Sequence, residues 1–316
     1  MTKKVVYITG CLGFIGSYVT RTCLEKGWYV MGVDCESYAA NTNYIKEFDK
    51  YENFTYQRKN INDLNMLYDC DYIINTAAET HVDNSIVNSH EFIRSNIDGV
   101  YNLLRLVQTK SRFRMPVLLH FSTDEVYGDV VSGSHSEADL MRPSNPYSAT
   151  KASADMLIQA WHRTYHVPYI IVRPSNNYGV GQYVEKFIPK VCKSLMLGRK
   201  VPMHENGTPI RTWLHAQDTA DAVIFLIEQD VKNEIYNISG NYEDTNINVF
   251  KKILKENGID PERYLDHADF SFTRPGQDVR YSVNDQKIRS LGWKNKKSFD
   301  NELSTVVSHY RSRFIW

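Results

Sequence analysis

Short apolar runs rich in β-branched residues alternate with longer segments of helical periodicity through the first half of this chain. The runs with the character of buried strands are Val5–Thr9, Tyr29–Asp34, Phe54–Gln57, Tyr72–Thr76, Val117–Ser122 and Tyr169–Arg173. Helical patterns lie between them, near residues 15–26, 88–110 and 147–164. Because strands separated by helices form parallel βαβ units, the alternation predicts an α/β fold with a doubly wound parallel sheet.

The pattern loosens after Ser175, where glycines and prolines interrupt it, although helices near 185–197, 217–228 and 246–257 are still predicted. We therefore expect a dinucleotide-binding Rossmann domain over residues 1–175. A smaller mixed region over 176–316 would mainly bind substrate, with some segments returning to the first sheet. The stretch 129–146 is rich in Ser, Gly and Pro and predicts a loop, either a lid or an ordinary surface loop.

Charge and cysteine content narrow the class of partner. Lys plus Arg and Asp plus Glu each number 37, so no net charge favours nucleic acid or anionic membranes. The five cysteines lack metal-binding or disulfide-framework spacing, so we expect no metal and a reducing, cytoplasmic compartment. No run approaches the roughly 18 apolar residues of a membrane-spanning helix, so we expect no membrane span.

A glycine-rich segment, Thr9–Gly16, follows the first strand and opens the first helix. Gly10 permits a tight turn, Gly13 lets the backbone approach a pyrophosphate, and Gly16 lets helix and strand pack closely. The helix N-terminus offers unpaired N–H groups to phosphates. Asp34 ends the second strand, where its carboxylate can accept hydrogen bonds from a ribose diol and repel a 2′-phosphate. The sequence thus predicts NAD rather than NADP.

Tyr147 and Lys151 lie four residues apart at the start of a predicted helix, so both side chains share one face. A tyrosine that acts as a base near neutrality needs its pKa lowered by roughly three units, or about 4 kcal/mol. An ammonium about 4 Å away supplies roughly that energy at an effective dielectric constant near 20. The pair is therefore a candidate for deprotonating a hydroxyl.

Thr123, Asp124 and Glu125 follow the fifth strand, at the edge where ligands of doubly wound sheets bind. Thr123 can hydrogen-bond a substrate hydroxyl or the tyrosine. The two adjacent carboxyl groups can divide into an acid and a base if their environments differ.

Together these segments resemble the extended short-chain dehydrogenases/reductases, and within them the dTDP-glucose or UDP-glucose 4,6-dehydratase family. The matching segments run in the family's order across nearly the whole chain. They are Thr9–Gly16, Asp34 with Tyr38, Ala77–Ser85, Ser122–Gly128, Tyr147–Lys151, Ser175–Gly179, Glu185–Pro189, Arg211–Leu214, Arg274–Gly276 and Leu291–Trp293. The triplet Thr123-Asp124-Glu125 discriminates most, because related epimerases and decarboxylases generally lack it.

The resemblance implies an enzyme, a hydro-lyase of deoxysugar biosynthesis that recycles its NAD. Tyr147, helped by Lys151 and Thr123, would take the proton of the glucose 4-hydroxyl while hydride leaves C4 for NAD. Glu125 would remove the C5 proton, and Asp124 would protonate the departing 6-hydroxyl. Return of the hydride to C6 would give a 4-keto-6-deoxy sugar.

The resemblance also implies binding residues and a homodimer formed through helices near 90–110 and 147–164. The implied cofactor-binding residues are Gly10, Gly13, Phe14, Ile15, Gly16, Asp34, Asn60, Ile61, Ala77, Ala78, Asn96, Ser122, Tyr147 and Lys151. The implied substrate-binding residues are Thr80, His81, Thr123, Asn176, Glu185, Lys186, Arg211, Asn246 and Arg274. Of these, Arg211 and Arg274 suit a diphosphate, because a guanidinium makes paired, charge-assisted hydrogen bonds.

Some alternatives stay open. His81–Ser85 is similar to plant UDP-glucose members, whereas Arg274–Gly276 resembles bacterial dTDP-glucose members, so either or both nucleotides could serve. Asn60 stands where bacterial members usually carry Asp, which affects expected cofactor affinity but not cofactor identity. The rival functions are a UDP-sugar 4-epimerase or decarboxylase of the same superfamily, and a non-catalytic dinucleotide-binding scaffold.

Overall fold

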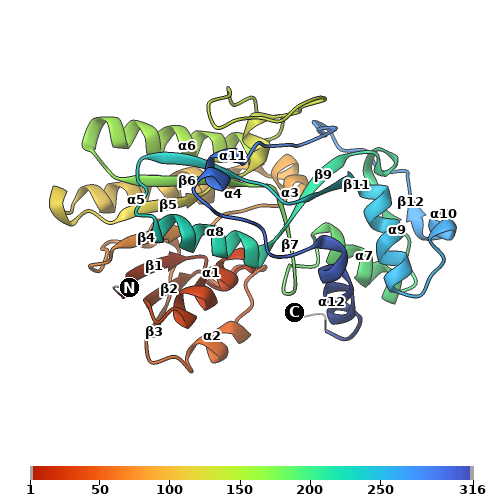
Figure 1. Cartoon of the computed structure of the whole chain (residues 1–316), viewed down its shortest axis with the longest axis horizontal. Helices are drawn as coiled ribbons and strands as arrows, with labels where there is room; N and C mark the ends of the chain where they lie inside the picture. The colour runs from red at the N-terminus through yellow and green to blue at the C-terminus, as the bar shows by residue number, and fades with distance from the viewer. Residues whose placement is uncertain (1–2, 314–316) are drawn as a thin grey trace.

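A seven-stranded, wholly parallel sheet forms the centre of the computed structural model, which describes residues 3–313 (Figure 1). Its strands are β1 (Val5–Thr9), β2 (Tyr29–Asp34), β3 (Phe54–Arg58), β4 (Tyr72–Asn75), β5 (Val117–Phe121), β6 (Tyr169–Pro174) and β10 (Glu234–Ile238). Their spatial order is β10-β6-β5-β4-β1-β2-β3. The predicted doubly wound fold is confirmed, and the order in which strands are added to the sheet reverses between β1 and β4. A crevice at the carboxyl ends of the strands is expected there.

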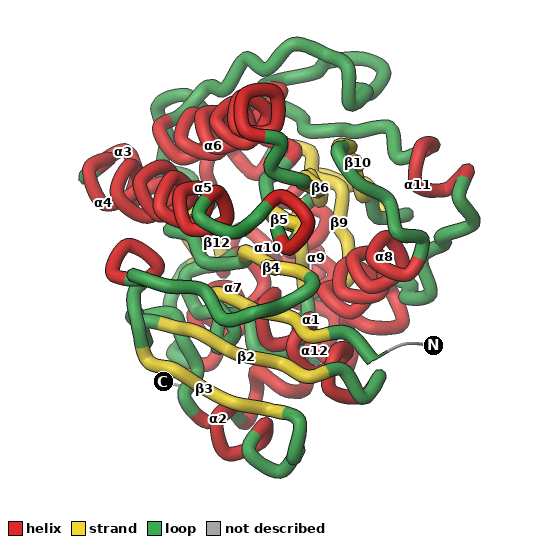
Figure 2. Tube along the Cα trace, turned by 90° about the vertical axis from the view of Figure 1, so that its left-hand side faces the viewer, coloured by secondary structure: helices red, strands yellow, loops and turns green. Residues whose placement is uncertain are grey.

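Helices cover both faces of this sheet, as Figure 2 shows with α5 and α6 on one side and α1 and α8 on the other. The helices of this half are α1 (Phe14–Glu25), α2 (Asn43–Phe48), α3 (Val82–Val87), α4 (Ser89–Ile93), α5 (Gly99–Gln108), α6 (Pro146–Tyr165) and α8 (Ala216–Glu228). Side chains alternate between the two faces with the period of a strand. Ile74 joins the apolar cluster beneath α8, whereas its neighbour Ile73 joins the cluster beneath α5 and α6.

The second region is smaller and mixed. It contains β7 (Asn176–Tyr178), α7 (Phe187–Met196), β8 (Val201–Pro202), β9 (Ile210–His215), β11 (Tyr242–Thr245), α9 (Asn246–Glu256), α10 (Tyr264–His267), β12 (Ala268–Asp269), α11 (Gln286–Ser290) and α12 (Phe299–Ser312). β9 pairs with β7 in parallel and with β11 in antiparallel orientation, and β8 pairs with β12. An aromatic-rich cluster around Trp213, Phe250 and Phe299 forms its core. Strand β10 belongs to the first sheet, and helix α8 packs on that sheet.

The helix predicted over residues 88–110 is confirmed over 89–108, with one π-helical turn inside it that the sequence did not predict. The structure divides it into α4, a π-helical turn (Arg94–Asp98) and α5. Asn96 in the turn accepts a hydrogen bond from the Glu79 backbone N–H at 2.9 Å and donates to the Glu79 carbonyl at 3.0 Å. Gly99 follows, where a Cβ would lie 2.3 Å from Ile61 Cδ1. Such π-helical turns are frequent at functional sites.

The loop over 129–146 is tied down rather than free. The Val130 N–H donates to the Arg280 carbonyl at 3.1 Å, and the His135 N–H donates to the Ser282 carbonyl at 2.9 Å. His135 also stacks on the Tyr127 ring. Within this loop only Asn145 lines the cavities described below, so the surface-loop alternative fits the structure better than the lid.

A buried ion pair stabilises the joint between the sheet and α6. Arg173 Nε donates to Asp155 Oδ2 at 2.9 Å, and Arg173 Nη1 donates to the Tyr127 hydroxyl at 2.6 Å. The Arg173 and Asp155 side chains are 2% and 0% exposed. Ser122 Oγ donates to the same carboxylate oxygen at 2.9 Å, which connects the pair to the end of β5.

We expect Arg173→Met to lower the free energy of unfolding by about 3–5 kcal/mol, because it leaves the Asp155 carboxyl buried without its cation. Urea unfolding measures this loss, which should shrink in acid, where Asp155 can become protonated. The double variant Arg173→Met/Asp155→Leu should recover most of the lost stability. An unchanged unfolding midpoint in Arg173→Met would contradict this account of the pair.

Candidate active site

Two cavities meet at the carboxyl edge of the central sheet. The first follows the glycine loop and the ends of β1, β2, β4 and β5, and the second lies against the C-terminal region. Five side chains line both cavities: Thr80, Glu125, Asn176, Glu185 and Lys186. The cavities are therefore two ends of one cleft, with Glu125 at their junction.

Two glycines of the loop, Gly10 and Gly16, have no room for a side chain. A Cβ on Gly16 would lie 2.0 Å from the Gly10 carbonyl oxygen, and a Cβ on Gly10 would lie 2.7 Å from the Ala77 nitrogen. Gly10 also has φ +74°, a conformation that favours glycine. Helix α1 begins directly after the loop, so its unpaired N–H groups face the first cavity. This cradle fits the pyrophosphate of a dinucleotide.

Asp34 lies at the end of β2 and lines the same cavity. Its Oδ2 accepts from the Leu12 N–H at 3.0 Å, and its Oδ1 accepts from the Glu36 N–H at 2.8 Å. Burial raises the pKa of this carboxyl group, and the backbone N–H donors oppose that shift. Each oxygen keeps a lone pair for a ribose hydroxyl, so the donor set fits NAD.

Most of the residues predicted to bind cofactor share this cavity. Those on its wall are Gly10, Gly13, Phe14, Ile15, Gly16, Asp34, Asn60, Ile61, Ala77, Ala78, Ser122 and Tyr147. Asn60 uses its side chain to cap the turn after β3, where it accepts from the Asn62 N–H at 2.9 Å.

Two predicted cofactor-binding residues, Asn96 and Lys151, do not line the cavity. The Asn96 amide is occupied by the Glu79 backbone and by the Thr150 hydroxyl, to which it donates at 2.9 Å. Lys151 Nζ donates to the Phe121 carbonyl at 2.5 Å. Both lie behind the cavity wall and support it, because their polar atoms satisfy backbone groups there.

Tyr147 is 8% exposed and lies at the first turn of α6, whose N-cap is Asn145. Its pKa is raised by burial first and by the nearby Glu125 second, whereas the Thr123 hydroxyl lowers it. The expectation that Lys151 lowers this pKa is therefore wrong for the protein without ligands. The physical reason is that the ammonium is directed at the Phe121 carbonyl. Burial also lowers the pKa of Lys151 to about 8.

Asp124 and Glu125 have different surroundings although they are adjacent. Burial and the neighbouring Glu125 raise the pKa of Asp124 to about 7, and Thr123 Oγ1 donates to its Oδ1 at 3.2 Å. Burial also raises the pKa of Glu125, but Arg211 and Asn145 oppose that shift. Near neutrality Asp124 can therefore carry a proton while Glu125 has cations and donors around its carboxylate.

The second cavity gathers nearly all residues predicted to bind substrate, with Thr123 on the first cavity instead. Its wall includes Thr80, His81, Asn176, Glu185, Lys186, Arg211, Asn246 and Arg274. Arg211 is held by backbone carbonyls, with Nη2 donating to Asp278 at 3.1 Å, and its guanidinium lies 4.3 Å from the Tyr281 ring centre. Lys186 Nζ donates to the Thr80 carbonyl at 2.8 Å.

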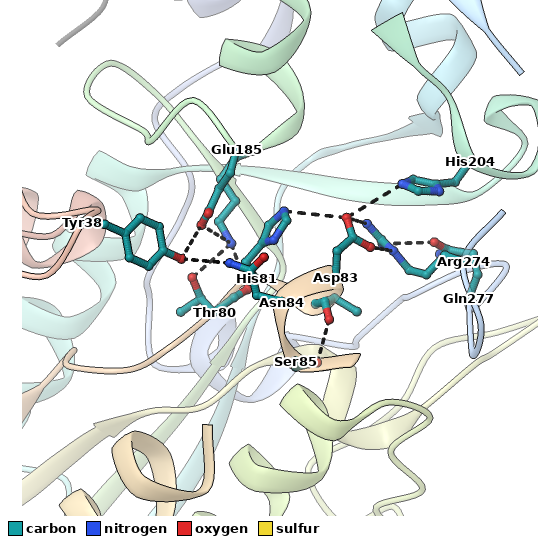
Figure 3. Close-up of polar contacts among 12 residues, drawn as sticks. Tyr38, Thr80, His81, Asp83, Asn84, Ser85, Glu185, His204, Arg274 and Gln277 are labelled. Carbon is teal, nitrogen blue, oxygen red and sulfur yellow. Dashed lines mark hydrogen bonds and ion pairs between the residues drawn. The ribbon is translucent and has the colours of Figure 1, made fainter. Parts of the chain in front are cut away.

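Arg274 makes a bidentate pair with Asp83 at the far end of this cavity (Figure 3). Its Nε and Nη2 donate to the carboxylate at 2.5 and 3.0 Å, and Nη1 donates to Gln277 Oε1 at 3.1 Å. Asp83 also lies 3.8 Å from His81 Nε2 and 3.9 Å from His204 Nε2. These groups hold the pKa of Asp83 below its usual range despite burial.

Sequence reasoning missed several wall residues, among them Asn145, Lys190, His204 and Tyr281. Asn145 could have been found, because Asn before Pro at a helix start is a capping signal. Lys190, His204 and Tyr281 carry no local motif, since their place in the cavity depends on long-range packing. Tyr281 lies with its hydroxyl 3.4 Å from Glu125 Oε2.

Two absences are observed within residues 3–313. His, Cys, Asp and Glu side chains form no cluster of three or more suited to a metal ion. In the same part of the chain, no helix combines the length and apolar character required to cross a membrane.

Curated relatives cover almost the whole chain. A dTDP-glucose 4,6-dehydratase of Haemophilus influenzae is 37% identical over 96% of this chain and 97% of its own length. A trifunctional UDP-glucose 4,6-dehydratase/UDP-4-keto-6-deoxy-D-glucose 3,5-epimerase/UDP-4-keto-L-rhamnose-reductase of Arabidopsis thaliana is 35% identical over 100% of this chain and 48% of its own length.

Solved structures of known enzymes have the same fold as this chain. The dTDP-glucose 4,6-dehydratase DesIV of Streptomyces venezuelae, solved with NAD bound, superposes with a TM-score of 0.91 at 33% identity and covers 98% of this chain and 97% of that one. A UDP-glucuronic acid 4-epimerase of Bacillus cereus has a TM-score of 0.90 at 22% identity, covering 98% and 99%, which shows a common fold alone. The sequence model of the GDP-mannose 4,6 dehydratase family matches residues 7–306, and this chain belongs to that family.

Proposed function

We propose that this protein is an NAD-dependent sugar-nucleotide 4,6-dehydratase. It converts a nucleoside-diphosphate glucose, dTDP-glucose or UDP-glucose or both, to the 4-keto-6-deoxy sugar. One observation carries the proposal: two adjacent carboxyl groups have unlike surroundings, with Glu125 where the two cavities meet and Asp124 beside it on the wall of the first cavity. A 4-epimerase or a binding scaffold needs no such pair.

Tyr147 is the base for the sugar 4-hydroxyl. NAD, when bound in the first cavity, supplies a reversible hydride acceptor for the carbon that bears this hydroxyl. Thr123 lies beside Tyr147 and lowers the pKa of its hydroxyl group, against the effect of burial. Hydrogen bonding of this kind helps a buried phenol to exchange a proton with the substrate.

Glu125 and Asp124 carry out the elimination. A ketone at C4 acidifies the C5 proton, which Glu125 accepts, because Arg211 and Asn145 favour its carboxylate form. Asp124 donates a proton to the departing 6-hydroxyl, because burial keeps its pKa near the working pH, at about 7.

The second cavity is the candidate site for the nucleotide part of the substrate. Arg274 has five N–H donors, of which Asp83 takes two and Gln277 one, so Nη1 and Nη2 each keep one for a phosphate oxygen. Because most of this cavity comes from residues 176–316, we assign substrate binding mainly to that region and NAD to residues 1–175.

We also propose a homodimer formed through the outer faces of α5 and α6. Tyr101, Met156 and Tyr165 on these helices are 46%, 53% and 41% exposed, and Trp161 contacts both tyrosine rings. Exposed apolar side chains on two neighbouring helices are typical of a protein–protein interface. All five cysteines are free, which supports a reducing, cytoplasmic compartment.

The deciding experiment incubates the protein separately with dTDP-glucose and UDP-glucose and identifies the products by mass spectrometry. We expect loss of one water from at least one of them. An intact but epimerised hexose would reject the dehydratase in favour of an epimerase.

We expect Tyr147→Phe to reduce turnover by at least about a hundredfold, because the 4-hydroxyl loses its base. The transient absorbance of reduced nicotinamide in a single turnover should disappear. Tyr68→Phe, at an exposed position that lines neither cavity, is the matched control and should keep normal turnover. Normal nicotinamide reduction in Tyr147→Phe would remove Tyr147 from the proposed chemistry.

Asp124→Asn and Glu125→Gln should both slow elimination strongly while nicotinamide reduction continues. In the unaltered protein, turnover should fall as pH rises through about 7, because Asp124 then loses the proton that it donates. Asp124→Asn should lack this alkaline loss and turn over slowly at every pH. If both variants release water at the normal rate, the assignment of acid and base is wrong.

Arg274→Lys should raise KM for the nucleotide sugar about tenfold with a smaller effect on kcat, because lysine cannot make paired hydrogen bonds to a diphosphate. Steady-state kinetics measures both constants. Arg280→Lys is the control, since Arg280 pairs with Glu243 and does not line the cavity. An unchanged KM in Arg274→Lys would exclude Arg274 from diphosphate binding.

A further inference from the structure

A row of buried polar side chains crosses the central sheet behind the candidate active site. Thr9 on β1, Asn75 on β4 and His120 on β5 are register partners at the carboxyl ends of adjacent strands. The three are 0%, 1% and 0% exposed. Thr9 Oγ1 donates to Asn75 Oδ1 at 2.6 Å, and Asn75 Nδ2 lies 3.0 Å from His120 Nδ1. We call these three residues the sheet ladder.

The ladder ends at Lys151. His120 Nε2 lies 3.4 Å from Lys151 Nζ, which also donates to the Phe121 carbonyl. Strand alternation places the ladder on the face covered by α5 and α6, because Tyr7, Ile73 and Leu118, two residues earlier in each strand, pack there. The ladder therefore joins the glycine-loop strand to the lysine of the active-site helix.

His120 is a neutral imidazole, because burial and the Lys151 ammonium lower its pKa well below the usual value. A neutral imidazole has one N–H donor and one acceptor nitrogen. With the Asn75 amide nitrogen toward Nδ1, as in the structure, Nδ1 accepts and Nε2 carries the proton. The Nε2–H group then faces Lys151 and finds an acceptor only if the lysine is an uncharged amine.

The hydrogen bonds along the ladder can also run in the opposite direction, and their number is then the same. A charged Lys151 donates to Nε2, Nδ1–H donates to the amide oxygen of a rotated Asn75, and the amide nitrogen donates to Thr9 Oγ1. Amide rotation exchanges groups of nearly the same size, so the packing does not change. The direction of hydrogen bonding along the ladder is thus coupled to the charge of Lys151.

We propose that His120 is a positioning residue for Lys151, and that its tautomer changes together with the lysine charge. The inference rests on the proposed function only where it gives Lys151 a role beside Tyr147. The ladder stabilises either charge state of a buried lysine, which would otherwise leave one polar partner unsatisfied. It acts through Lys151 and does not touch substrate.

Apart from His120, the ionisable groups near Lys151 are Asp155 and Tyr147. Asp155, one turn further along α6, favours the ammonium but is shared with Arg173 of β6. Tyr147 lies one turn earlier on α6, and His120 is the ionisable group that faces Lys151 from β5. Since Asp155 is already paired, His120 is the remaining group whose bonding can follow the lysine proton.

Nitrogen-15 NMR of histidine-labelled full-length protein tests the tautomer directly. His120 is identified among the ten histidines by the signal that His120→Gln removes. We expect protonated Nδ1 two pH units below the Lys151 pKa of about 8, and protonated Nε2 two units above it. A single tautomer over this range overturns the proposal.

Lys151→Met is the matched variant for the NMR test. It removes the titrating group, so His120 should keep one and the same tautomer at every pH. The same pH-dependent change of tautomer in Lys151→Met would overturn the proposal, because the change could not then depend on the lysine charge.

Kinetics gives an independent test. His120→Phe removes the acceptor for the ammonium and should lower kcat about tenfold, with KM for the nucleotide sugar changed less than about twofold. The alkaline limb in the pH profile of nicotinamide reduction, a step that precedes proton donation by Asp124, should move to lower pH in a single turnover. His120→Gln, which keeps an acceptor, should restore most of kcat and of this profile. His162→Phe, a histidine on α6 that contacts the Val167 carbonyl, should change neither.

An unshifted pH profile in a folded His120→Phe would overturn the positioning role. Failure of the proposed function gives a different result, in which the unaltered protein removes no water from either nucleotide sugar while the tautomer still follows the Lys151 charge.

Discussion

Desolvation of ionisable groups at the carboxyl edge of the central sheet is the constraint on which the site depends. Asp124, Tyr147, Lys151 and Asp155 are each almost completely buried, and burial is the largest cause of every pKa shift among them. A buried charge is tolerated only when another group offsets it. The site therefore requires the Arg173 pair, the Thr123 hydroxyl and the sheet ladder to be in place together.

The same constraint explains why two adjacent carboxyl groups can have different roles. Asp124 lines the first cavity, and its Oδ2 is buried with no hydrogen-bond partner among residues 3–313. Glu125 faces the junction of the two cavities, near Arg211, Asn145 and Tyr281. One group is thereby favoured as the acid and its neighbour as the base, although the backbone places them side by side.

Much of the fold could be predicted from local patterns. Two of the six predicted strands, β1 and β2, match the structure completely, and the other four differ from it by one residue at one end. Glycine-loop spacing also predicted a cradle that only glycine can form. The expected pKa of Tyr147 was wrong, because helical spacing shows that Tyr147 and Lys151 share a face but not which acceptor the ammonium selects. The π-helical turn inside helix 88–110 was not predicted, because it is accompanied by hydrogen bonds between Asn96 and the Glu79 backbone, which periodicity does not report.

The sequence by itself determined the sheet, the glycine cradle and the chemical types gathered at the strand ends, since these depend on side-chain periodicity and local backbone freedom. Only the tertiary structure decided which ionisable and hydrogen-bonding groups lie close enough to affect one another's protonation. His120, Asn75 and Thr9 are 45 and 66 residues apart along the chain, yet parallel register makes them neighbours. Burial and long-range hydrogen bonds set protonation, and both depend on the distances between segments that are remote in sequence.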